Sequence, residues 1–208
     1  MRLLSGRTAV TLCVVASVLI FATAGLIGGL HFSPDTRMIS ELAFERSARY
    51  GLTEFAIILT LFGGAPALLA ILLLAVTFLA DAKRWRDLLS LTAIVIGGRI
   101  AIELLKLAID RSRPAFDPYP VDVHSMSFPS GHAGNSMITF LAISLIAAPP
   151  RRRGRAVAIA LVASLLVGAT RPILGVHWPS DVIGGWALGI GWVVGLEVLT
   201  RRWRSASK

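Results

Sequence analysis

Long apolar stretches separated by short polar segments dominate this sequence. The hydrocarbon core of a bilayer is about 30 Å thick, and about 20 helical residues are needed to cross it. Six stretches approach or exceed that length: 8–30, 56–80, 88–109, 132–148, 156–173 and 182–200. The fourth and fifth are short and need flanking residues to complete a span. The pattern predicts an all-α fold, a bundle of six transmembrane helices.

Between the first two stretches, residues 34–50 mix apolar and charged side chains. This mixture predicts an interfacial amphipathic helix that lies along the membrane surface between spans 1 and 2. The run that follows, 52–80, is too long for one straight span, and Gly63-Gly64-Ala65-Pro66 interrupts it. Proline kinks or breaks a helix, so a bend with a purely structural role is expected at this point.

The start of the sequence resembles a signal peptide, because Arg2 and Arg7 precede an apolar stretch that reaches Ala22-Thr23-Ala24. A signal peptide has an apolar region of about 7–15 residues, whereas the stretch here continues to Leu30. A retained first helix is therefore expected. The absence of repeats and low-complexity tracts predicts one integral membrane domain over 1–208, with its core at about 55–200.

Composition agrees with a membrane protein. Charged residues make up 16% of the chain, against about 25% in soluble domains, and the mean hydropathy is +0.72. The net charge of +9 could suggest nucleic acid binding, but Lys and Arg lie in short clusters between the apolar stretches. That distribution is typical of membrane topology, so no nucleic acid partner is expected.

The basic residues also predict the orientation, because cytoplasmic loops carry an excess of Lys and Arg. One side of the predicted bundle holds thirteen of the 21 basic residues, the opposite side holds seven, and Arg99 lies inside a span. Both termini are therefore expected in the cytoplasm. The thirteen residues are Arg2, Arg7, Lys83, Arg84, Arg86, Arg151, Arg152, Arg153, Arg155, Arg201, Arg202, Arg204 and Lys208.

Three polar clusters fall on the side opposite the termini. Residues 106–114 close the third apolar stretch, 127–132 open the fourth, and 170–181 bridge the fifth and sixth. Together they bring cations, a helix start that contains glycine, two histidines and a carboxylate to one face of the membrane. Such a set suits a phosphate group, so a phosphate site is expected on the periplasmic or external face.

The first part of this set is expected to bind the phosphate anion. Lys106, Arg113 and Arg171 offer positive charge and several donors to phosphoryl oxygens. Ser130 precedes an apolar helix and can cap it, so that the first N–H groups of the helix face an anion. Gly131 has no side chain and allows the backbone to approach the phosphate closely.

The second part of the set is expected to carry out the reaction with the phosphate. Asp181 follows His177 by four residues and can hold one ring nitrogen, which leaves the other nitrogen to attack phosphorus. Asp181 would also stabilise the charged ring, and His132 could protonate the departing oxygen as a general acid. Two histidines and one carboxylate could bind a metal in isolation, but three nearby cations oppose that. No metal or cofactor is expected.

The three motifs Lys106-x6-Arg113-Pro, Pro-Ser-Gly-His132 and Arg171-x5-His177-x3-Asp181 resemble those of the type 2 phosphatidic acid phosphatase superfamily. This superfamily includes bacterial acid phosphatases, glucose-6-phosphatase and vanadium haloperoxidases. All three motifs occur in order and at similar spacing, and the resemblance covers residues 55–200. Thr170 departs from the serine that usually precedes the third motif, but it keeps the hydroxyl.

The resemblance implies a role for each matching residue. Phosphate would be bound by Lys106, Arg113, Ser130, Gly131 and Arg171. His132 would be the general acid, His177 the nucleophile, and Asp181 the residue that orients His177. Arg111 and Thr170 would support these residues without touching the substrate.

A lipid phosphate or diphosphate is the expected substrate, with undecaprenyl diphosphate, phosphatidylglycerol phosphate and phosphatidic acid as candidates. Hydrolysis in a bacterial inner membrane is the leading prediction. Transfer of the phosphoryl group to an alcohol on another lipid or glycan remains open, since it would use the same phosphohistidine. An anion transporter is disfavoured, because the span interiors hold few ionisable groups.

Three further features complete the predictions. Arg99 and Glu103, four residues apart inside a span, are expected to form an ion pair. The small residues Gly185, Gly189, Gly191 and Gly195 permit close helix contact in span 6, either within the bundle or in a homodimer. His31 and His124 are expected to be structural rather than catalytic.

Overall fold

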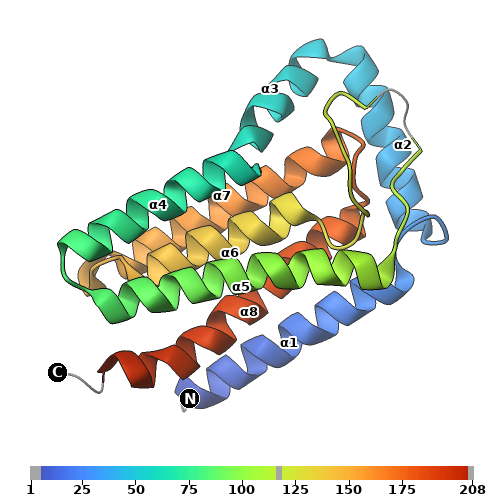
Figure 1. Cartoon of the computed structure of the whole chain (residues 1–208). Helices are drawn as coiled ribbons and strands as arrows, with labels where there is room; N and C mark the ends of the chain where they lie inside the picture. Colours follow the sequence, from blue (N-terminus) through green and yellow to red (C-terminus); the bar gives the residue numbers. More distant parts are fainter. Residues whose placement is uncertain (1–5, 116–118, 206–208) are drawn as a thin grey trace.

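A computed structural model describes residues 6–115 and 119–205, and all regular elements within these ranges are helices. The all-α prediction is therefore confirmed. Both ends of the chain lie at the same end of an elongated bundle, as do the α4–α5 and α6–α7 connections (Figure 1). The long helices are α1 (Gly6–Ile27), α4 (Ala65–Asp81), α5 (Trp85–Ile109), α6 (Gly131–Ile146), α7 (Arg153–Ile173) and α8 (Pro179–Ser205).

Each of the six predicted apolar stretches is mostly helical, and the protein is a multi-pass membrane protein. Among the described residues, α1, α5, α7 and α8 are each long and apolar enough to cross a membrane. A bent pair, α3 (Tyr50–Thr60) and α4, passes the same test as one unit. The shortest of the six is α6, whose 16 residues span about 24 Å at 1.5 Å per residue.

The bend between α3 and α4 falls at the predicted Gly-Gly-Ala-Pro sequence. A short 3-10 helix, η1 (Leu61–Gly63), follows α3, and the two halves of the span differ in direction by 43°. Gly64 is extended and Pro66 lies in the first turn of α4, where a missing N–H breaks no helical hydrogen bond. Gly63 packs against other helices, since an added Cβ would lie 2.3 Å from Val167 Cγ1.

The glycine row of α8 serves contacts within the chain. A Cβ on Gly185 would lie 2.8 Å from the Ser130 carbonyl oxygen, and a Cβ on Gly191 would lie 2.8 Å from Ser17 Cβ. The first contact joins α8 to the start of α6 and the second joins it to α1. Small residues thus bring three helix backbones close together, as in other membrane bundles.

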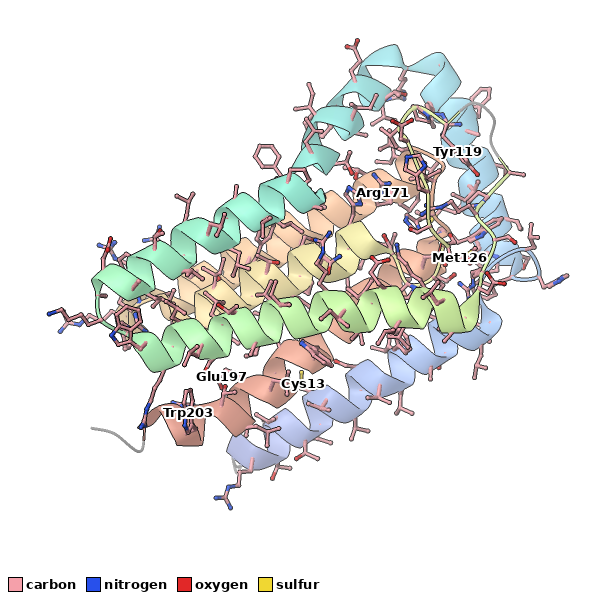
Figure 2. All side chains as sticks on the ribbon, viewed as in Figure 1. Cys13, Tyr119, Met126, Arg171, Glu197 and Trp203 are labelled. Atoms are coloured by element: carbon pink, nitrogen blue, oxygen red, sulfur yellow. The ribbon has the colours of Figure 1, made fainter. Side chains whose placement is uncertain are left out.

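The segment predicted as an amphipathic helix forms α2 (Ser33–Ala48). This helix crosses the end of the bundle that is opposite the termini (Figure 1). Arg46 ties it to α7, because its Nη1 donates to the Ile173 carbonyl at 3.2 Å. The side chains of Tyr119, Met126 and Arg171 lie at this same end, far from Trp203 (Figure 2).

Candidate active site

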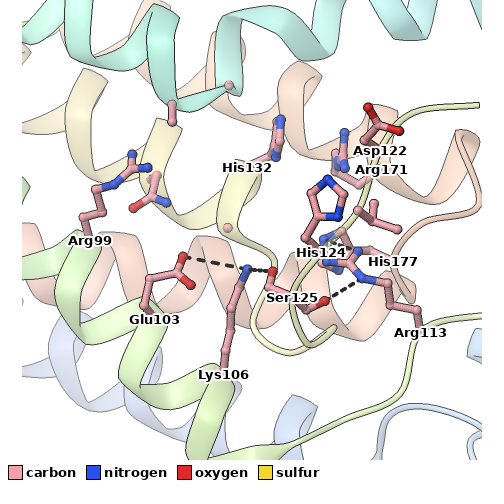
Figure 3. Close-up of a pocket in the computed structure, with 15 residues that line it drawn as sticks. Arg99, Glu103, Lys106, Arg113, Asp122, His124, Ser125, His132, Arg171 and His177 are labelled. Carbon is pink, nitrogen blue, oxygen red and sulfur yellow. Dashed lines mark hydrogen bonds and ion pairs between the residues drawn. The ribbon is translucent and has the colours of Figure 1, made fainter.

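A polar cavity of about 170 Å³ lies at this end of the bundle. Its wall combines side chains from α5, α6 and α7 with the break before α4 and the loops that precede α6 and α8 (Figure 3). Six of the sequence-predicted site residues line it: Lys106, Arg113, Gly131, His132, Arg171 and His177. The structure therefore brings together residues that are separated by up to 71 positions in the sequence.

His177 lies in the short loop between α7 and α8 and is almost fully buried. Gly175, with φ of +72°, provides the turn that leads into it, a conformation that favours glycine. The Nδ1 atom of His177 is 3.3 Å from Asp181 Oδ2. This is slightly long for a hydrogen bond, but the carboxylate lies in position to accept a proton from Nδ1.

The other ring nitrogen of His177 faces Arg113, whose Nη1 is 3.1 Å from Nε2. A guanidinium only donates, so Nε2 is the acceptor and Nδ1 carries the proton in this arrangement. Arg113 is itself fixed by two carbonyl oxygens, those of Ser125 at 2.8 Å and Val176 at 2.6 Å. The Nε2 lone pair of His177 is thus directed at a residue predicted to hold phosphate.

The pKa of His177 is lowered well below its ordinary value of 6.5. Burial is the largest cause, and the positive charges of Arg113, Arg171 and Lys106 lower it further. The imidazole is therefore neutral at neutral pH, as a nucleophile must be.

Three cations approach the cavity from separate elements. Lys106 is buried, and its Nζ donates to Ser125 Oγ at 2.7 Å. Arg171 is buried too, and its Nη1 donates to Thr60 Oγ1 at 2.7 Å while its Nε has no hydrogen-bond partner among the described residues. Unsatisfied buried donors are costly, so Arg171 retains capacity to bind an anion.

The start of α6 differs in one respect from its predicted form. Ser130 occupies the N-cap position, but its side chain makes no capping hydrogen bond and its buried Oγ has no partner among the described residues. Its backbone N–H donates to the Asp181 carbonyl at 3.0 Å. The first N–H groups of α6 lack intrahelical acceptors, and a Cβ on Gly131 would come within 3.3 Å of Lys106 Nζ.

Arg111 is not among the residues that line the cavity, and it binds the carboxylate of Asp181 outside it. Its Nη1 donates to Asp181 Oδ1 at 2.8 Å, and its Nη2 donates to the Ala24 carbonyl of α1 at 3.0 Å. The guanidinium lies 4.4 Å from the centre of the Phe128 ring. The remaining carboxylate oxygen of Asp181, Oδ2, accepts from Ser127 Oγ and from the Trp178 N–H.

Several of these supporting residues have no distinguishing signal in the sequence. Asp35 of α2 is buried and accepts from the backbone N–H and the hydroxyl of Ser180. Thr60, at the end of α3, holds Arg171. Both are isolated polar residues in otherwise unremarkable stretches, and only their contacts across the fold reveal them.

One expectation about individual residues is wrong. Arg99 and Glu103 form no ion pair, and Glu103 Oε1 lies 3.8 Å from Lys106 Nζ instead. Thr170, expected to support the site, donates its Oγ1 proton to the Val167 carbonyl at 2.6 Å.

The break before α4 also has more than the structural role expected for it, since Gly63 and Ala65 line the cavity. His124, expected to be structural, lines it as well.

A family model described as the PAP2 superfamily matches residues 87–205, more than half of the chain. The chain belongs to the PAP2 superfamily. Phosphatidylglycerophosphatase B of Bacillus subtilis is 38% identical over 114 residues, which cover 52% of this chain and 55% of that protein. An undecaprenyl-diphosphatase of Sulfolobus acidocaldarius is 33% identical over 114 residues, covering 51% and 48%. The chain thus matches about half the length of the curated relatives.

The fold likeness extends further than the sequence matches. The crystal structure of a transmembrane PAP2-type phosphatidylglycerolphosphate phosphatase from Bacillus subtilis superposes with a TM-score of 0.81 at 27% identity. The superposition covers 91% of this chain and 96% of that one. Most of the first 86 residues, which the family model does not match, therefore share the PAP2 fold.

Proposed function

We propose that this protein is a membrane lipid phosphatase that removes a terminal phosphate through a phosphohistidine on His177. The observation that carries the proposal is the meeting of Lys106, Arg113 and Arg171 around the neutral ring of His177 in one small cavity. The names of the two relatives support a lipid phosphate or diphosphate as the substrate class.

The bound phosphate, with up to two negative charges, offsets most of the charge of the three cations. Arg113 and Arg171 present planar forks to non-bridging oxygens and Lys106 adds a point charge. Gly131 and the first N–H groups of α6 approach from the side, where the positive end of the helix favours an anion. Ser130 Oγ is buried beside them and has no hydrogen-bond partner in the described part of the chain, so it can turn to donate to one phosphoryl oxygen.

The chemical step begins when the Nε2 lone pair of His177 attacks phosphorus. An N–P bond forms as the bond between phosphorus and the lipid oxygen breaks, and His132, which holds a proton once the anionic phosphate is bound beside it, transfers that proton to the lipid oxygen. Asp181 accepts the Nδ1–H hydrogen bond and stabilises the positive ring of the phosphohistidine. Arg111 holds Asp181 in place for this purpose.

Hydrolysis completes the cycle. Water attacks the phosphorus while neutral His132 takes its proton, the N–P bond breaks, and inorganic phosphate leaves. His132 is then protonated and His177 neutral, the states from which the chemical step began. The three cations and the helix start provide the charge that Mg²⁺ supplies in other phosphoryl-transfer sites, so we propose that the reaction needs no metal.

We place the site on the non-cytoplasmic face of a bacterial inner membrane. The end that holds the termini also carries the α4–α5 and α6–α7 connections with their basic residues, and basic loops favour the cytoplasm. In this arrangement the six apolar stretches all cross the membrane, and α2 lies at the outer interface.

Purified protein provides the test, with inorganic phosphate release measured from phosphatidylglycerol phosphate, undecaprenyl diphosphate and phosphatidic acid. Wild type is expected to hydrolyse at least one of these lipids, and His177→Ala is expected to release no phosphate while remaining folded. His31→Ala, at an exposed histidine, is the control and should keep full activity. Equal phosphate release by His177→Ala and wild type would exclude His177 as the nucleophile.

A chelator tests the independence from metal. Activity is expected to survive EDTA unchanged. Loss of phosphate release in EDTA, with recovery on addition of Mg²⁺, would refute the metal-free mechanism.

A further inference from the structure

Arg99 is a charged residue inside a membrane-spanning helix with no assigned role in the reaction. It lies on α5, seven residues before Lys106. It is therefore about two turns, or about 10 Å, closer to the N-terminus of the helix than Lys106 is. No hydrogen bond or ion pair joins its side chain to any residue that the structure describes. Because a charge at this depth is costly, a counter-ion from outside the protein would stabilise it.

Glu103 does not supply that counter-charge. It lies between the two cations on the same helix, but its carboxylate is 3.8 Å from Lys106 Nζ and half exposed. Glu103 therefore pairs with Lys106 and not with Arg99. Arg99 remains available to a ligand in the cavity.

Arg99 also marks the junction of two cavities. It lines the polar cavity of the active site together with His132 and His177. It lines a second cavity as well, of about 470 Å³, whose wall is mostly apolar and includes Leu69 of α4 and Val95 of α5. Ala65, Arg99 and Asn135 belong to both walls, so the two spaces adjoin at the guanidinium.

The order of the side chains across the site indicates how a lipid substrate would be oriented. In the close-up of the site, Arg99 lies on the far side of His132 from His177 (Figure 3). A nucleophile attacks phosphorus roughly in line with the leaving oxygen. The leaving side of the substrate therefore points away from His177, past His132, toward Arg99 and then the apolar cavity.

We infer that Arg99 binds a second phosphate of the lipid, located between the phosphate that is removed and the hydrocarbon tail. This inference rests on the proposed function and narrows its substrate class. The guanidinium fork pairs with two oxygens of a phosphate, and the tail enters the apolar cavity beside it. A lipid diphosphate carries such a group directly, and a lipid with a phosphodiester carries it beyond a short linker. A lipid with one phosphate leaves Arg99 unpaired.

Substrate preference in Arg99→Gln tests the inference. With undecaprenyl diphosphate and phosphatidylglycerol phosphate, kcat/KM is expected to fall by about 10- to 100-fold, the value of a charge-assisted hydrogen bond. With phosphatidic acid and with para-nitrophenyl phosphate, it should fall by less than about threefold. Arg99→Lys keeps the charge and should recover part of the preference.

Arg86→Gln is the matched control, since Arg86 lies at the opposite end of α5 and bonds to the Trp203 carbonyl. It should leave all ratios unchanged. A loss confined to one of the two lipids with two phosphates supports the inference and identifies the diphosphate or the phosphodiester as the group bound. Equal loss on all four substrates, or none on any, overturns it.

A binding measurement separates this inference from the proposed function. In the His177→Ala background no turnover is expected, so dissociation constants for the same lipids can be compared with and without Arg99→Gln. Weaker binding of the two-phosphate lipids alone, by about 10-fold or more, supports the role of Arg99 even if phosphate release fails as an activity. Unchanged binding overturns it.

Discussion

The ion pair between Arg111 and Asp181 offers a quantitative test of how the site is held together. Arg111 Nη1 is 2.8 Å from Asp181 Oδ1, and the side chains are 10% and 0% exposed. Arg111→Gln leaves a buried carboxylate without its cation. Breaking a buried pair in this way costs about 3–5 kcal/mol. Because Ser127 and the Trp178 N–H still donate to Asp181, we expect the lower end, about 3 kcal/mol.

Thermal unfolding in detergent measures this loss, and the midpoint is expected to fall by roughly 6–12 °C. The control is Arg37→Gln, which removes a pair with the same 2.8 Å separation whose side chains are 82% and 61% exposed. Exposed pairs contribute little, so no measurable change is expected there. Equal midpoints for the two variants would refute the assignment of stability to the buried pair.

The double variant extends the test. Asp181→Asn alone leaves Arg111 without its counter-charge, whereas Arg111→Gln with Asp181→Asn leaves no buried charge. The double variant should therefore lose less stability than the sum of the two single losses, by at least about 1 kcal/mol. Additive losses would mean that the two side chains act independently.

Two further predictions concern the helix break at Gly63 and the protonation of His177. Gly63→Ala places a Cβ 2.3 Å from Val167 Cγ1 and 3.1 Å from His132 Cδ2. This variant should destabilise the folded protein by about 1–3 kcal/mol and slow phosphate release. The control Gly51→Ala, with open space around it, should do neither. The pKa of His177 in the folded protein lies well below 6.5. As pH falls below 6.5, His177 therefore becomes protonated only in the unfolded chain, and the free energy of unfolding decreases. Wild type should lose about 1 kcal/mol more than His177→Asn between pH 7.5 and 5.5, and parallel stability curves would contradict the lowered pKa.

The helices and the gathering of the motifs could be predicted from local information. Lys106, His132 and Arg171 each lie near the end of an apolar stretch on the same side of the membrane, and alternation of helix direction therefore brings them to one end of the bundle. Hydrophobic length and charge distribution are sufficient for this step, because the bilayer restricts the fold to spanning helices.

The residues that hold the site could not be predicted in the same way. Thr60 and Asp35 bond to partners 111 and 145 positions away, and nothing local distinguishes them from other polar residues. Spacing also misled at one pair of residues. Arg99 and Glu103 have the spacing of a helical ion pair, but Glu103 lies near Lys106.

The central claim, that phosphate passes through His177, is tested most directly by isolating the phosphorylated protein. A lipid substrate radiolabelled in its terminal phosphate is mixed with the purified enzyme, and the reaction is stopped rapidly with alkali, in which phosphohistidine survives. The label is expected on the peptide that contains His177, to be lost in acid, and to be absent in His177→Ala. Label on His132 instead, or an active enzyme that never carries label under these conditions, would contradict the account.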